Sequence, residues 1–87
     1  MNKLSEILTG PETWCQHIST SGPRHCLLGA VMRLTDGRSA YEREREYDRL
    51  RQICGKETGE WNDAPERTWD EVAAVVSAYD TDRLLNP

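Results

Sequence analysis

The segment Cys26-Leu27-Leu28-Gly29-Ala30-Val31-Met32-Arg33-Leu34 is the most apolar part of this chain, and it limits the possible folds most strongly. At helical spacing its apolar residues fall on two faces, one made by Leu27, Ala30, Val31 and Leu34 and the other by Leu28 and Met32. A helix that is apolar nearly all round is buried, so we expect a central helix here. Gly29 lowers helix propensity by about 1 kcal/mol relative to alanine, which predicts close approach by a neighbouring element.

Shorter and longer helical segments are predicted on both sides of this central helix. Lys3 to Leu8 has one and a half amphipathic turns, and Pro11 can open a second turn that Trp14 anchors in the core. Ser39 can cap a long helix that continues to about Cys54, with Gly55 as its stop.

The clearest helix start in the chain is Thr68-Trp69-Asp70-Glu71, which has the spacing of a capping box. It predicts a helix from Trp69 to about Asp80, with an apolar stripe made by Val72, Val75, Val76 and Tyr79. Irregular connections are expected at residues 16–24 and 56–67, where turn-forming residues are frequent. The sequence therefore predicts a mainly α fold: one domain over residues 1–87, with about four helices around the central one.

The long helix carries the alternating charges Glu42-Arg43-Glu44-Arg45-Glu46, which we interpret as a solvated face. Opposite charges there are spaced to pair at i+3, as Glu42 with Arg45 and Arg43 with Glu46. The inward face of the same helix is predicted to consist of Tyr47, Leu50, Ile53 and Cys54.

Composition excludes several classes of function. The net charge is -4, and no arginine cluster is free of neighbouring carboxylates, so nucleic-acid binding is not expected. No apolar run approaches the ~20 residues needed to cross a bilayer, and the N-terminus lacks the pattern of a signal peptide. With three cysteines, an odd number, reduced thiols in the cytoplasm are the expectation.

Two chemical constellations involve cysteine and histidine. Cys15, His17, His25 and Cys26 supply ligand types that suit tetrahedral zinc, but their spacing does not match a typical structural site, and we predict no metal and no other cofactor. Cys26 at a helix N-terminus, with His25 or His17 as a base, is the arrangement of a nucleophilic enzyme. A small buried thiol is the simpler interpretation of Cys26.

The run Trp61-Asn62-Asp63-Ala64-Pro65-Glu66-Arg67 is the third candidate site. As a structural loop, it would use Asn62 or Asp63 in an Asx turn and Arg67 as a bridge to a carboxylate. As a binding site, it would present Trp61, Asn62, Asp63 and Arg67 to a partner protein, because tryptophan and arginine often dominate binding hot spots.

Three features of the chain belong together: Trp14-Cys15-Gln16, the His25-Cys26-Leu27-Leu28-Gly29-Ala30 helix start, and Trp61-Asn62-Asp63-Ala64-Pro65-Glu66-Arg67-Thr68 before the Glu71-Val72 helix. Together they resemble a family of short actinobacterial and actinobacteriophage proteins of unknown function, and the Asn-Asp-Ala-Pro-x-Arg-Thr run is the most specific part of the match. The resemblance spans nearly the whole chain, although this chain is shorter between the first two motifs. It implies a cytoplasmic protein, encoded by a phage in some cases, and supplies no activity.

The sequence favours a small non-enzymatic interaction protein that binds a protein partner and modulates a bacterial host protein. This hypothesis depends on the small size, the absence of a convincing catalytic set and the resemblance. The alternative is a small cysteine-dependent or metal-dependent enzyme that uses Cys26 with a nearby histidine.

Overall fold

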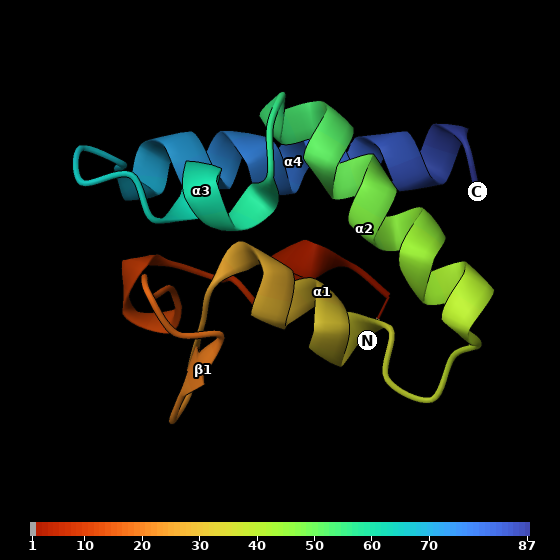
Figure 1. Cartoon of the computed structure of the whole chain (residues 1–87), viewed down its shortest axis with the longest axis horizontal. Helices are drawn as coiled ribbons and strands as arrows, with labels where there is room; N and C mark the ends of the chain where they lie inside the picture. Colours follow the sequence, from red (N-terminus) through yellow and green to blue (C-terminus); the bar gives the residue numbers. More distant parts are fainter. Residues whose placement is uncertain (1) are drawn as a thin grey trace.

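The computed structural model describes residues 2–87 and confirms the predicted mainly helical fold (Figure 1). In chain order its elements are the 3-10 helices η1 (Leu4–Glu6) and η2 (Pro11–Thr13), the strands β1 (Thr20–Ser21) and β2 (Arg24–His25), and the helices α1 (Leu27–Leu34), α2 (Ala40–Cys54), α3 (Thr58–Asn62) and α4 (Trp69–Leu85). No helix within residues 2–87 combines the length and apolar character needed to cross a membrane.

The helices form two layers around a shared apolar core. In Figure 1, α4 runs along the long axis of the molecule, α2 crosses in front of it, and α1 lies below with the N-terminal turns. α4 packs against α2 and η1, while α1 packs against α2, α3 and η1. Four segments contribute the core: Leu4, Ile7 and Leu8; Leu27, Ala30, Val31 and Leu34; Leu50; and Val72, Val75, Val76 and Tyr79.

The predicted central helix is present, but it is buried on one face rather than all round. The Leu27–Leu34 face lies in the core, whereas Leu28 is half-buried and Met32 is exposed. A chain of this length has too few elements to cover every face of an eight-residue helix, because small domains bury a smaller share of their surface.

The predicted caps of α2 and α4 are confirmed. The Ser39 hydroxyl accepts the N–H of Glu42 at 3.2 Å, and Gly55 ends α2 in the left-handed region with φ 79°. At the start of α4, the Thr68 hydroxyl accepts the N–H of Glu71 at 3.3 Å, and the Glu71 carboxylate accepts the N–H of Thr68 at 2.9 Å. This reciprocal pair is the capping box expected from the sequence.

Three boundaries differ from the predicted ones. α4 continues past Asp80 to Leu85. The apolar stripe does not extend into these last turns, and ion pairs of Asp82 and Arg83 with α2 stabilise them instead. The predicted irregular connection at 56–67 contains α3, which tertiary burial of Thr58 and Asn62 stabilises. The predicted irregular connection at 16–24 overlaps the β1–β2 hairpin, which ends at His25 and whose turn uses Gly22 with φ 62°.

Candidate functional site

The side chain of Asn62, fully buried at the end of α3, joins three of the sequence motifs. Its Oδ1 accepts the indole N–H of Trp14 at 2.8 Å and the backbone N–H of Leu27 at 3.1 Å. Its Nδ2 donates to the carbonyl of Cys15 at 3.1 Å and to the carboxylate of Asp63 at 2.9 Å. All these partners are satisfied inside the fold, so this amide acts as an internal connector.

The segment after Trp14 docks on the same end of α3. The Gln16 amide donates to the carbonyls of Asn62 and Ala64, each at 2.9 Å. The backbone N–H of His17, a residue with φ 69°, donates to Asp63 at 2.9 Å. Burial by itself raises the pKa of Asp63, but the hydrogen bonds from His17 and Asn62 bring that pKa below its ordinary value.

Trp61 and Arg67, which flank the loop between α3 and α4, lie against each other. The Arg67 guanidinium stacks over the Trp61 ring at 3.8 Å from its centroid and donates from Nε to the Trp61 carbonyl at 2.8 Å. Its Nη1 also pairs with Glu71 at 3.1 Å, and only 15% of the side chain is exposed. Arg67 therefore connects α3 to the first turn of α4.

The close approach predicted at Gly29 occurs against the β1 side of the hairpin. A Cβ at position 29 would lie 2.0 Å from the carbonyl oxygen of Ser19. The same oxygen accepts the N–H of Cys26 at 3.1 Å. The Cys26 thiol in turn accepts the N–H of Gly29 at 3.2 Å, so sulfur serves as the N-cap of α1.

The four cysteine and histidine candidates are only partly brought together. Cys15 lies beside the segment 25–26, where its N–H donates to the His25 carbonyl at 3.1 Å. Burial, and secondarily the neighbouring Cys26, raises the pKa of Cys15. The His25 ring contacts the Thr20 hydroxyl at 3.1 Å, and His17 is largely exposed beside Asp63.

No histidine ring forms a hydrogen bond with a cysteine sulfur within residues 2–87. The same residues hold no group of three or more His, Cys, Asp or Glu side chains arranged to bind a metal ion.

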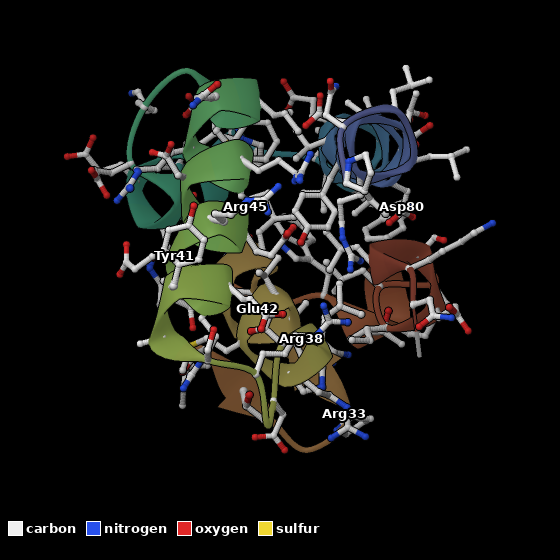
Figure 2. The ribbon with its side chains drawn as sticks, turned by 90° about the vertical axis from the view of Figure 1, so that its right-hand side faces the viewer. Arg33, Arg38, Tyr41, Glu42, Arg45 and Asp80 are labelled. Atoms are coloured by element: carbon white, nitrogen blue, oxygen red, sulfur yellow. The ribbon has the colours of Figure 1, made fainter. Side chains whose placement is uncertain are left out.

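A second site, not predicted from the sequence, is an open cleft of about 530 Å³ between α2, α4 and the N-terminal residues Asn2 and Lys3, which we call the α2–α4 cleft. Figure 2 shows Arg38, Glu42 and Arg45 on the α2 side of this cleft and Asp80 on the α4 side. Its volume lies in the range of small-molecule pockets. The exposed side chain of Leu84 adds an apolar contact at its rim.

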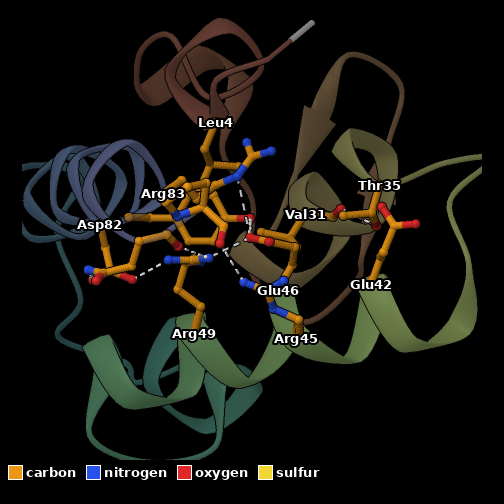
Figure 3. A network of polar contacts seen from close by, with 12 residues as sticks. Leu4, Val31, Thr35, Glu42, Arg45, Glu46, Arg49, Asp82 and Arg83 are labelled. Carbon is orange, nitrogen blue, oxygen red and sulfur yellow. Dashed lines mark hydrogen bonds and ion pairs between the residues drawn. The ribbon is translucent and has the colours of Figure 1, made fainter.

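The floor of the cleft is a buried ion network centred on Glu46 (Figure 3). Its carboxylate accepts the Tyr79 hydroxyl at 2.7 Å and Arg49 Nε at 3.1 Å, and it lies 3.4 Å from Arg83 Nε. Arg49 also pairs with Asp82. Burial, and secondarily the hydrogen bond to the Glu46 carboxylate, raises the pKa of Tyr79.

The interpretation of Glu42 to Glu46 as a solvated face is therefore wrong at Glu46, which is 9% exposed. The expected i+3 pairs are replaced by Arg38 with Glu42 and by Arg49 with Glu46. A sequence signal existed: Glu46 precedes Leu50 by four residues and Ile53 by seven, so it lies on the inward face of α2.

The comparisons with known proteins assign a family. The family of unknown function DUF6197 matches residues 2–79, which include all three motifs and most of α4. The chain belongs to DUF6197. No curated protein and no solved structure matches it. Within this DUF6197 member, the three motifs meet around Asn62.

Proposed function

We propose that this DUF6197 protein is a non-enzymatic binding protein that docks an acidic segment of a partner protein in the α2–α4 cleft. The observation that carries this proposal is the pairing of arginines with an exposed leucine in one cleft. Arg45 lines it without a side-chain carboxylate partner among residues 2–87, and Leu84 is 80% exposed. Arginine and apolar side chains in one hollow suit an acidic group flanked by an apolar residue.

The motif residues support a binding protein over an enzyme. The Cys26 sulfur is engaged as a helix cap, and the Cys15 thiol donates to the Ile18 carbonyl at 3.3 Å. Selective alkylation of Cys26 at neutral pH, or zinc in the purified protein, would favour the cysteine-dependent or metal-dependent enzyme instead.

The resemblance to actinobacterial and phage proteins supports a more specific proposal for the partner. The partner is a bacterial host protein in the cytoplasm, and this protein, where a phage encodes it, modulates that host protein. The Trp61–Arg67 segment is a second candidate for the surface that contacts the partner, because Trp61 and Asp63 are each partly exposed.

Affinity capture from a bacterial lysate with matched variants tests the proposal. We expect Arg45→Ala and Leu84→Ala each to weaken capture of the same protein by more than about 1 kcal/mol, as hot-spot residues do. Arg51→Ala is the control, because Arg51 lies on the same helix outside this cleft and pairs with Asp48. Equal capture by all four proteins would contradict the proposed surface.

A further inference from the structure

The backbone places Cys15 and Cys26 opposite each other. Trp14 and His25 form a parallel bridge, and the N–H of Cys15 donates to the His25 carbonyl at 3.1 Å. Trp14 and Cys26 both have extended backbone, so the next residues of the two segments, Cys15 and Cys26, are in register and direct their side chains to the same face. Neighbouring strands lie about 4.8 Å apart, within the range of roughly 4.4 to 6.8 Å between the Cα atoms of disulfide-bonded cysteines.

The side chain of Asn62 shows independently that these two segments are close. Its Nδ2 donates to the carbonyl of Cys15 at 3.1 Å, and its Oδ1 accepts the N–H of Leu27, the residue after Cys26, at 3.1 Å. One amide group therefore spans the two segments at the level of the cysteines. Cys26 also contributes, after burial, to the raised pKa of Cys15, as a second thiol nearby does.

Both thiols are free and partly exposed. Cys15 donates its S–H to the Ile18 carbonyl at 3.3 Å, and the Cys26 sulfur accepts the Gly29 N–H at 3.2 Å. Sulfur is a weak donor and a weak acceptor, so a rotation about χ1 that turns the two sulfurs toward each other gives up little hydrogen-bond energy. The third cysteine, Cys54, is the last residue of α2 and packs against the core.

We propose that Cys15 and Cys26 form a reversible disulfide, which makes this pair an oxidative modification site of the protein. The oxidant is a small-molecule disulfide such as glutathione disulfide. The thiolate of one cysteine attacks a glutathione sulfur, so that a mixed disulfide forms, the S–S bond of the oxidant breaks and one glutathione leaves. The other thiolate attacks the protein sulfur of the mixed disulfide and displaces the second glutathione. The two protein thiols lose two electrons and two protons, and the two released glutathione thiols carry them.

Neither step requires an unusually reactive thiol, because the second sulfur is held close to the first. Oxidation would take the Cys26 sulfur away from the Gly29 N–H and so remove the side-chain cap of α1. The pair shares no residue with the α2–α4 cleft, so this inference does not depend on the proposed function.

Disulfide mapping of the full chain, equilibrated with glutathione disulfide and glutathione at neutral pH, tests the proposal. Trypsin cleaves after Arg24, so a disulfide between Cys15 and Cys26 links the peptides 4–24 and 25–33. We expect this linked peptide pair as the main oxidised product in mass spectra, and its complete return to thiols with dithiothreitol. Cys54→Ala should form the same disulfide, whereas Cys15→Ala should stop at a mixed disulfide with glutathione.

Cys15 and Cys26 are also the two cysteines nearest in sequence, so the same equilibration in concentrated urea separates the effect of the fold from that of chain proximity. We expect the equilibrium constant for forming the disulfide to be about tenfold or more larger in the folded protein than in the unfolded chain. An equal or larger constant in urea, disulfides that include Cys54, or mixed disulfides without the Cys15–Cys26 product would each overturn the proposal.

Discussion

At the scale of single residues, the buried Asn62 side chain connects segments of the chain that lie far apart in sequence. One amide group satisfies an indole N–H, two backbone groups and a carboxylate that come from three separate segments. The sequence suggested a turn or a binding role for Asn62, because an asparagine before an aspartate is typical of turns. Apart from the adjacent Asp63, its partners are distant in sequence, so a local pattern could not reveal them.

Replacing this amide tests its connecting role. We expect Asn62→Ala to lower the free energy of unfolding by roughly 3 kcal/mol, since it leaves the buried Trp14 N–H and Leu27 N–H without acceptors. Urea unfolding measures the change, and Asn86→Ala, an exposed amide, is the control. A shift of less than about 0.5 kcal/mol, the size of a surface effect, would refute the connector role.

Replacement of two helical glycines by alanine should change the stability of the fold in opposite directions. Gly29→Ala should destabilise the fold by about 2 kcal/mol, because the new methyl group would lie 2.0 Å from a backbone oxygen of Ser19. Gly59→Ala in α3 meets nothing within 4 Å and should raise stability by up to about 1 kcal/mol through helix propensity. Thermal melts of both variants would contradict this explanation if the two changes had the same sign.

At the scale of elements, the sequence predicted α2 and the start of α4 correctly, because a helix cap depends only on residues within one turn of the helix end. Ser39, Gly55 and the Thr68–Glu71 pair mark those boundaries in the structure. The end of α4 and the existence of α3 depend on contacts with other elements, such as Arg49 with Asp82. The cleft escaped prediction for the same reason, since its residues come from α2, α4 and the N-terminal residues.

The capping box of α4 gives a prediction at this scale. Thr68→Ala should reduce stability by roughly 1 kcal/mol, the usual loss for an N-cap hydroxyl. Ser77→Ala, at an exposed position inside the same helix, should be neutral or slightly stabilising. If urea midpoints of the two variants coincide, the Thr68 hydroxyl does not stabilise the helix start.

At the scale of the whole molecule, the buried Tyr79 and the partly buried Cys54 make the fold sensitive to alkaline pH. Burial raises the pKa of Cys54 from 9.0 to about 11, and burial with the bond to Glu46 raises the pKa of Tyr79 above its ordinary 10.0. Both groups are neutral when protonated. Their stabilising contributions are therefore complete below pH 9.0 and are lost as the pH rises through the raised values.

Stability should thus fall steadily above pH 9.0 in the wild type. Tyr79→Phe should be about 1 kcal/mol less stable near pH 7, because it loses the hydrogen bond to Glu46, yet its decline at high pH should be shallower. Denaturant unfolding from pH 7 to 11 measures both effects. A variant curve parallel to the wild-type curve across the alkaline range would show that Tyr79 does not contribute to this sensitivity.

We propose that the Trp61–Arg67 segment supports the fold and that the α2–α4 cleft binds the partner. Arg67→Ala and Arg45→Ala, each assayed for thermal stability and for partner capture, separate these two roles. We expect Arg67→Ala to lower the melting temperature, since it loses the Trp61 stack and the Glu71 pair, while capture falls only with the unfolded fraction. Unchanged stability of Arg67→Ala with a specific loss of capture would contradict the claim and place the binding surface on the loop.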